Sequence, residues 1–261
     1  GFPHCPARPA RMPPLPEPAP LLALFSDFGV QGPYMGQMRA VLHQCAPGLP
    51  IVDLFADAPR YDVRAASYLL AAYAPDMPAH SILVCVIDPG VGSERPPMIF
   101  RAGERTFVGP GNGLFEIMAR RAGNFDAQSI IWRPGNLSAS FHGRDLFAPV
   151  AATLARGAEV ATGPIDDDAW RQSDWPDDLA RVIYLDPFGN VITGLRAADL
   201  SPDQTVMAGE ETLLRARTFS DVAMGQAFWY ENANGLVEIA VNQGSAARQL
   251  DLELGDEVTV P

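Results

Sequence analysis

The feature that most constrains the fold is an alternation of apolar runs and amphipathic segments over residues 21–88. Three apolar runs have the length and composition of buried strands, and the two segments between them repeat apolar residues at helical spacing. Strand, helix, strand, helix and strand in this order predict a parallel sheet with right-handed crossover connections. Further strand candidates follow, among them residues 129–134. We therefore predict a mostly parallel α/β sandwich domain over residues 21–165.

The sequence changes character after residue 165. Residues 166–180 are rich in aspartate and lose the regular apolar pattern, which is typical of a connection between domains. Residues 181–261 contain short apolar runs separated by turn-forming residues, and this spacing predicts a small antiparallel β-barrel domain. Residues 1–20 are rich in proline and lack periodicity, so we predict a disordered arm there.

Charge and cysteine content exclude several functional classes. The chain has 19 Lys and Arg against 31 Asp and Glu, a formal net charge of −12, and no basic run, which argues against a nucleic-acid partner. No apolar run approaches the roughly 18 residues that a membrane helix needs. Cys5, Cys45 and Cys85 lack the spacing of a disulfide framework or a zinc site. We expect a cytoplasmic protein without a membrane segment or a metal.

Polar side chains follow the predicted strands at their carboxyl ends, where open α/β sheets place their ligand sites. Asp27 follows the first strand in SDFG, and a carboxylate there can accept both hydroxyls of a ribose. Asp88 ends a strand in VCVIDPGVGSER, and Arg95 can fold back to hold this carboxylate with a fork of donors. The alternatives are a turn aspartate at position 27 and a structural salt bridge between Asp88 and Arg95.

Two later stretches add further candidates. In VGPGNG the glycines allow a close approach of the backbone to a ligand, and Asn112 offers both a donor and an acceptor. This pattern differs from the known phosphate-binding loops, so phosphate binding is unsupported. His142 in FHGRDLFAP directly precedes a predicted helix. An isolated histidine is more often structural than catalytic, and the residues alone leave this open.

The C-terminal region gathers polar and aromatic residues around predicted turns. Asparagine and aspartate favour turns for local reasons, so hairpin structure can explain each polar residue singly, and the two phenylalanines can be ordinary core residues. These candidates are Asp186, Phe188, Asn190, Phe219, Asn234 and Asn242.

Several of these motifs occur in a recognisable order. SDFG, YMGQMRAVL, DPGVGSER, VGPGNG, FHGRDLFAP, DPFGN and NGLVEIAVNQGSA together resemble the motifs of the S-adenosyl-L-methionine (SAM) hydroxide adenosyltransferases, or SAM hydrolases. These enzymes are relatives of fluorinating and chlorinating enzymes. The resemblance runs from about residue 21 to the end. It implies an α/β domain and a β-barrel in a homotrimer, with each site between the α/β domain of one subunit and the barrel of the next.

The resemblance also implies roles for single residues. Asp88, Arg95 and His142 correspond to the triad of the family, which activates a water molecule. Asp27 corresponds to the carboxylate that binds the ribose diol, and Tyr61 to an aromatic ring against the sugar. Asp186 and Asn190 correspond to the groups that hold the methionine amino end, and Phe219, Asn242 and Ala246 fall where the adenine is bound. Asn234 stands where fluorinating relatives hold the methionine carboxylate with arginine. Asn112 is a further expected substrate contact, without an assigned part of the substrate.

These correspondences imply hydrolysis of SAM to adenosine and L-methionine, by attack of water on the ribose C5′, without a cofactor or metal. Halogenation at C5′ is one alternative. Halogenating relatives lack the triad aspartate and carry a small hydroxyl residue where this chain has Gly143, so Asp88 and Gly143 favour hydrolysis. A trimer that binds SAM or adenosine without turnover is the other alternative, and an intact triad argues against it.

Overall fold

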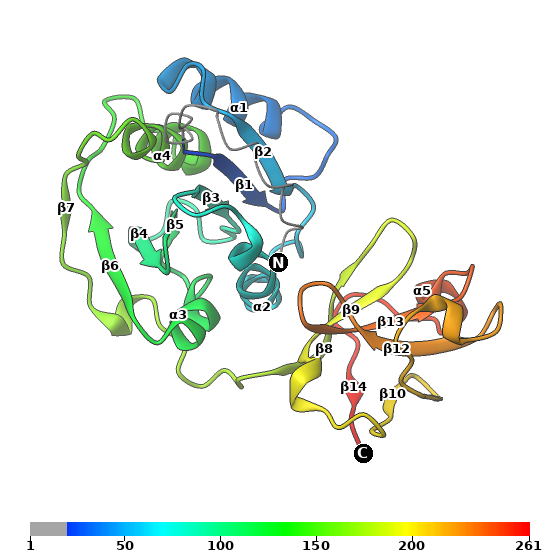
Figure 1. Cartoon of the computed structure of the whole chain (residues 1–261). Coiled ribbons are helices and arrows are strands. Elements are labelled where there is room, and N and C mark those ends of the chain that lie inside the picture. Colours follow the sequence, from blue (N-terminus) through cyan, green and yellow to red (C-terminus); the bar gives the residue numbers. More distant parts are fainter. Residues whose placement is uncertain (1–19) are drawn as a thin grey trace, which may run out of the picture.

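The computed structural model describes residues 20–261, so the arm predicted for residues 1–20 lies outside the described residues except for Pro20 (Figure 1). Figure 1 shows an N-terminal part with a sheet between helices and a C-terminal part made mainly of strands. The predicted combination of an α/β domain with an antiparallel β domain is confirmed. None of the helices in the described part is long and apolar enough to cross a membrane.

The N-terminal domain is built on a seven-stranded sheet with the order β2-β1-β3-β5-β4-β6-β7. The parallel strands are β1 (Leu22–Ser26), β2 (Ile51–Phe55), β3 (Ile82–Val86) and β5 (Arg105–Pro110). The antiparallel strands are β4 (Pro97–Ala102), β6 (Phe125–Ile130) and β7 (Thr162–Gly163). Every residue of β1 and β3 is buried, as expected for central strands with both faces covered.

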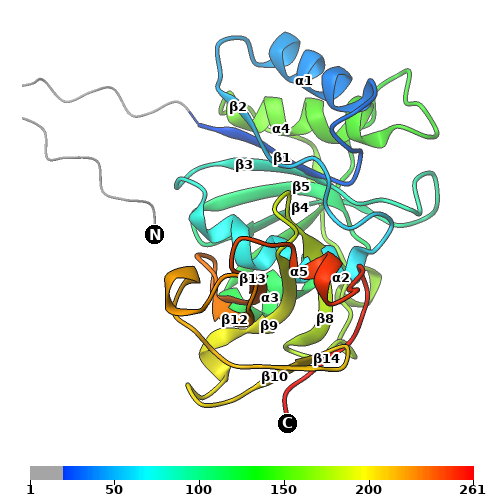
Figure 2. The same ribbon diagram turned by 90° about the vertical axis from the view of Figure 1, so that its right-hand side faces the viewer.

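Helices cover both faces of this sheet (Figure 2). One pair is α1 (Tyr34–Cys45) with α4 (Ala148–Ala155), and the other is α2 (Val63–Tyr73) with α3 (Glu116–Ala122). The alternation of side chains along β1 serves both layers, because Leu22 and Leu24 pack with α1 and α4, whereas Phe25 packs with α2. Asp62 caps α2 as predicted, since its carboxylate accepts a hydrogen bond of 2.8 Å from the N–H of Ala65.

The predicted strand over residues 129–134 is wrong in position. The strand β6 covers Phe125–Ile130, and Ile131 beyond its end is 60% exposed. The N–H groups of Ile131 and Trp132 both donate to the carbonyl of Ala161, so the chain leaves the sheet there. The apolar run SIIW suggested a strand centre, whereas the paired segment FDAQSI is mixed in polarity and half-buried.

The C-terminal domain consists of two antiparallel sheets. The four-stranded sheet contains β12 (Ala227–Glu231), β13 (Leu236–Val241), β9 (Val191–Arg196) and β8 (Leu179–Leu185). The three-stranded sheet contains β11 (Glu211–Leu213), β10 (Val206–Ala208) and β14 (Val258–Thr259). Isolated bridges join Arg181 to Glu257 and Arg215 to Trp229, which connects both pairs of sheet edges and closes the strands into a barrel.

Short helical segments complete the structure. They are the single turns η1 (Ala74–Asp76), η3 (Asp167–Ala169), η4 (Ala197–Asp199) and η5 (Phe219–Asp221), the π-helical turn η2 (Gly143–Phe147) before α4, and α5 (Ala246–Gln249) after β13.

Residues 166–180, the predicted connection, are packed against the α/β domain. Trp170 is buried beside Phe100. The fully buried carboxylate of Glu116 on α3 accepts hydrogen bonds from Arg171 at 2.7 Å, from the N–H of Gln172 at 2.9 Å and from the guanidinium of Arg120 at 2.6 Å. Burial raises the pKa of Glu116, but these donors outweigh burial and bring the pKa down to about 2. The barrel is therefore attached to the first domain through a fixed segment.

Candidate active site

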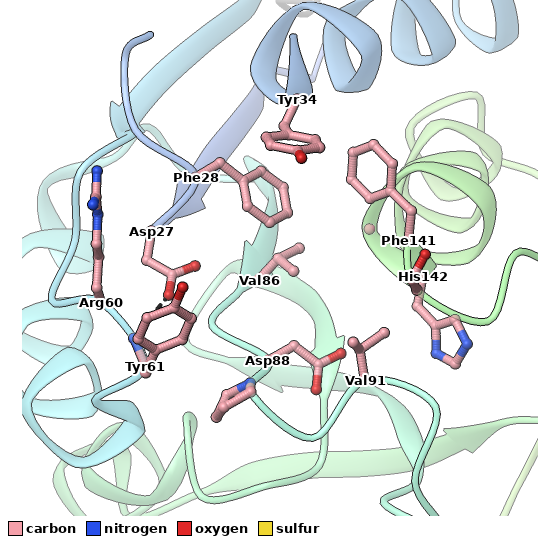
Figure 3. A pocket seen from close by; sticks show the side chains of 13 residues that line it. Asp27, Phe28, Tyr34, Arg60, Tyr61, Val86, Asp88, Val91, Phe141 and His142 are labelled. Atoms are coloured by element: carbon pink, nitrogen blue, oxygen red, sulfur yellow. Dashed lines mark hydrogen bonds between the residues drawn. The ribbon is translucent and has the colours of Figure 1, made fainter. Parts of the chain in front are cut away.

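A pocket of about 330 Å³ lies in the α/β domain at the carboxyl ends of β1 and β3. Asp27 directly follows β1, Asp88 follows β3, and His142 stands just before η2. Arg60 and Tyr61 reach the same pocket from the loop between β2 and α2 (Figure 3). The fold thus brings four segments that are distant in sequence to one edge of the sheet, as the strand-end pattern predicts.

Asp88, Arg95 and His142 form one connected group beside this pocket. The guanidinium Nε of Arg95 donates to Oδ1 of Asp88 at 2.9 Å, and its Nη2 donates to Oδ2 of the same carboxylate. The same Nη2 lies 2.9 Å from Nδ1 of His142. The side chains of Asp88 and Arg95 are only 5% and 9% exposed, and the guanidinium also packs on the ring of Phe147. Arg95 therefore fixes both of its neighbours in place.

These contacts determine the tautomer of His142. A guanidinium has donors only, so Nδ1 of His142 must accept from Arg95 and its proton must lie on Nε2. Burial lowers the pKa of His142, and the positive charge of Arg95 lowers this pKa further. His142 is therefore neutral at pH 7, with an N–H available as a donor.

Asp27 and Tyr61 meet at another side of the pocket. Oδ2 of Asp27 accepts a hydrogen bond of 2.9 Å from the backbone N–H of Tyr61. Tyr61 has a φ of 58°, a value that favours glycine, and its side chain is 75% exposed. Burial raises the pKa of Asp27, while the N–H of Tyr61 and the charge of Arg60 act in the opposite direction. Figure 3 shows the side chains of Asp27 and Tyr61 next to each other in the pocket.

The sequence analysis missed the aromatic wall of this pocket. Phe28, Tyr34 and Phe141 come from three segments, and their ring centroids are 5.6 to 5.9 Å apart in each pair. Two of them, Phe28 and Phe141, are immediate neighbours of the candidate residues Asp27 and His142. All three also lie in the motifs SDFG, YMGQMRAVL and FHGRDLFAP, but no periodicity connects them, so the sequence did not show that their rings meet.

The barrel carries a second pocket, of about 600 Å³. Among the predicted residues, Asp186, Asn190 and Phe219 line it. Asp186 holds the turn between β8 and β9, because its carboxylate accepts from the N–H groups of Phe188 and Asn190 and from the Asn190 side chain, each at 2.9 Å. Phe188 is 79% exposed at this pocket, so its interpretation as a core residue is wrong.

Tyr230, Glu238 and Arg248 also line the barrel pocket, and sequence reasoning singled out none of them. Glu238 is buried and accepts hydrogen bonds from Tyr230 and from Asn232. Burial raises the pKa of Glu238, and the nearby charge of Asp186 adds to this effect. The floor of the pocket is therefore acidic, whereas Arg248 is an exposed positive charge.

Besides Arg95, which lies behind Asp88 and His142, four predicted residues line neither pocket: Asn112, Asn234, Asn242 and Ala246. The side chain of Asn112 donates at 2.9 Å to the carbonyl of Ile87, so it holds the chain just before Asp88. The side chain of Asn242 donates at 2.9 Å to the carbonyl of Val222. Asn234 donates at 2.7 Å to the carboxylate of Asp76 in the other domain. Ala246 is fully buried at the start of α5.

The described residues contain few other reactive groups near each other. Within residues 20–261 there is no cluster of three His, Cys, Asp or Glu side chains that could hold a metal ion. Cys45 and Cys85 are free thiols, and Cys5 lies outside the described residues. Asp88, Arg95 and His142 are the candidate reactive group of the first pocket.

Comparison with protein families agrees with this geometry. The model for the N-terminal domain of SAM hydroxide adenosyltransferases matches residues 22–163, and the model for their C-terminal domain matches residues 180–259. The chain belongs to the SAM hydroxide adenosyltransferase family. The gap between the two matches, residues 164–179, lies between the two domains of the fold.

Individual relatives of this family are similar over most of the chain. An (R)-S-adenosyl-L-methionine hydrolase from Thermus thermophilus is 37% identical over 249 residues, covering 88% of this chain and 95% of the relative. An enzyme of the same name from Salinispora arenicola is 34% identical over 255 residues, covering 92% and 97%. Fluorinases are more distant, with 22% identity for that of an Actinoplanes species.

The fold is also similar to a solved structure. The crystal structure of an uncharacterized conserved protein from Thermotoga maritima superposes with a TM-score of 0.78 at 27% sequence identity, covering 92% of this chain and 99% of that one. The combination of the two domains is therefore shared, and not only the separate domains.

Proposed function

We propose that this chain hydrolyses SAM to adenosine and L-methionine. The observation that carries the proposal is the connected group of Asp88, Arg95 and His142 beside a pocket that also contains Asp27. Relatives with 34–37% identity over most of the chain are named SAM hydrolases, which supports the same conclusion.

The protein does not have to activate the sulfur atom of SAM for this reaction. Because the sulfonium already makes methionine a good leaving group, no acid has to protonate it. The reaction instead needs a water molecule that is aligned with the C5′–S bond and that loses a proton as it attacks. The protein therefore has to position this water and accept its proton.

The geometry divides these tasks between two side chains. Nε2–H of His142 donates to the water and orients it, since Nδ1 is occupied by Arg95. Asp88 accepts the proton, because each of its oxygens keeps a lone pair beyond the bond to Arg95. The new C5′–O bond forms as the C5′–S bond breaks, methionine leaves with the electron pair, and the proton passes from Asp88 to solvent.

We further propose that water is the second substrate and that the reaction uses no cofactor and no metal. Asp27 binds the ribose diol with its carboxylate oxygens, and Tyr61 covers the sugar. We place the enzyme in the cytoplasm, which the free thiols Cys45 and Cys85 support.

We also propose that a second copy of the chain completes the site, in a homotrimer. No residue beyond Gly143 lines the first pocket, whereas Asp186, Asn190 and Phe219 line a separate pocket on the barrel. Exposed aromatic side chains at both pockets, Tyr61 and Phe188, support an interface that covers them. Light scattering coupled to size-exclusion chromatography measures the molar mass in solution, and we expect the mass of three chains.

The proposed activity is tested by incubating the purified chain with SAM, with and without chloride or fluoride, and identifying the nucleoside product by mass. We expect adenosine and methionine in equal amounts, at a rate independent of halide. A 5′-halogenated nucleoside would instead assign the chain to halogenation. Binding of SAM without any product would assign it to ligand sensing.

A further inference from the structure

SAM presents one anionic group to the enzyme, the carboxylate of its methionine part. At the position where fluorinating relatives bind this group with arginine, this chain has Asn234, whose side chain is occupied by Asp76 of the same chain. The carboxylate must therefore meet a different donor. This inference rests on the proposed function, because it concerns how the same substrate is bound.

Arg60 places a guanidinium at the first pocket that no side chain in the described part of the chain holds, although its positive charge acts to lower the pKa of Asp27. Its side chain is exposed and lines the pocket, and it forms no ion pair or side-chain hydrogen bond with another residue of 20–261. By contrast, Arg95 is fully engaged by Asp88 and His142. Arg60 is therefore available to a ligand.

The backbone next to Arg60 leaves room for a ligand. Gly29 has a φ of +85°, and a Cβ atom placed on it would lie 3.5 Å from Nη2 of Arg60. A side chain at position 29 would thus be strained and would cover the guanidinium. Glycine at position 29 leaves this atom of the guanidinium uncovered.

The stereochemistry of the reaction gives the direction in which methionine leaves. In an in-line displacement the leaving group departs from the side of C5′ opposite the attacking water. Figure 3 shows His142, which orients the water, at one side of the pocket, and Arg60 with Asp27 at the opposite side. Asp27, which we propose binds the ribose, therefore shares a side of the pocket with Arg60, away from the side chain that orients the water.

We propose that Arg60 binds the carboxylate of the methionine part of SAM through a bidentate pair, and that it makes the enzyme prefer substrates with this carboxylate. A planar fork of donors matches a carboxylate, and such charge-assisted pairs are the strong ones among hydrogen bonds. Arg60 is then a specificity residue, separate from the triad that handles the water.

The test combines a variant with a truncated substrate. Turnover and equilibrium binding are measured for SAM and for decarboxylated SAM, which keeps the sulfonium and the amine but lacks the carboxylate. We expect Arg60→Gln to lower kcat/KM for SAM about 10- to 100-fold, mostly through KM, and to change kcat/KM for decarboxylated SAM by less than about threefold. Arg60→Lys should restore part of the preference, because it keeps the charge but loses the fork.

The matched control is Arg101→Gln, which removes an arginine that pairs with Asp126 away from the pocket. It should keep the wild-type preference. Equal losses on both substrates in Arg60→Gln, or no loss on either, would overturn the proposal. So would Arg248→Gln, at the barrel pocket, abolishing the preference while Arg60→Gln retained it. A wild-type chain that binds SAM without turnover would refute the proposed hydrolysis, and the ratio of the two dissociation constants would still test Arg60.

Discussion

The two pockets of this chain differ in how complete they are. In the α/β pocket the charged groups satisfy one another, since Asp88, Arg95 and His142 are bonded together and partly buried. In the barrel pocket Asp186 holds its own turn, and Phe188 projects into solvent. The difference shows that Asp88, Arg95 and His142 come together within a single chain. We propose that the barrel pocket, in contrast, binds substrate only when a second copy of the chain covers it.

The largest effect on the rate is expected for the group of Asp88, Arg95 and His142. Asp88→Ala should lower kcat about 10²- to 10⁴-fold, because it removes the acceptor of the proton. Binding of SAM should change little, since Asp27 and the barrel pocket remain. Rates are measured by adenosine formation and binding by calorimetry. Near-normal turnover in this variant would show that the α/β pocket is not the reactive half.

The second prediction tests whether the two halves come from different copies. Asp88→Ala damages only the α/β pocket, and Asp186→Ala damages only the barrel pocket. After the two inactive variants are unfolded together and refolded as a 1:1 mixture, about a quarter of the sites in a ring should contain both intact halves. The mixture should therefore regain about a quarter of the wild-type rate.

Each variant refolded alone is the control and should stay inactive. A mixture as inactive as its components would mean that each chain closes its own site, and it would remove the argument for a shared interface.

A smaller effect is expected for the barrel pocket. We expect the exposed ring of Phe188 to pack on the adenine of SAM bound at the barrel pocket. Phe188→Ala should therefore raise KM for SAM about tenfold and leave kcat unchanged, because an aromatic ring stacked on a base contributes about 1–3 kcal/mol. Leu254→Ala, another exposed apolar side chain, is the control and should leave KM unchanged. A loss confined to kcat in Phe188→Ala would place the barrel pocket in the chemistry and break the division between the two pockets.

The smallest effect concerns pH. The pKa of His142 is lowered by burial and by Arg95, so the neutral form persists to below the ordinary histidine value of about 6.5. Lowering the pH from 7.5 to 6.5 should therefore reduce kcat/KM by less than about twofold through His142, with a steeper loss only at lower pH. A pH–rate profile for the wild type and for His142→Gln, which cannot titrate there, measures this contribution. A fall in kcat/KM that begins above pH 6.5 in the wild type and is absent from His142→Gln would contradict a neutral His142.

Local sequence patterns predicted most of the fold but not its long-range contacts. Apolar runs predicted buried strands such as β1 and β3, and the position of Asp62 before a helix predicted that it caps this helix. The aromatic wall of Phe28, Tyr34 and Phe141 comes from three segments, so no local pattern could reveal it.

The site was predicted unevenly for a related reason. The resemblance placed Asp88, Arg95 and His142 together, and strand ends alone predicted where Asp27 and Asp88 lie. Asn234 bonds to Asp76, 158 positions away in the chain, and such a contact depends on how the domains pack. The exposure of Phe188 could not be foreseen either, because a phenylalanine in a turn has the same sequence signal whether it faces the core or a pocket.

Attack of water at C5′, directed by the group around Asp88, is tested most directly by following the oxygen atom. SAM is incubated with the enzyme in ¹⁸O-labelled water, and the adenosine is analysed by mass spectrometry with fragmentation of the ribose. The account predicts one ¹⁸O atom at the 5′ position, with label incorporation slowed in Asp88→Ala in proportion to turnover. Adenosine without label at the 5′ position would contradict attack of water at C5′.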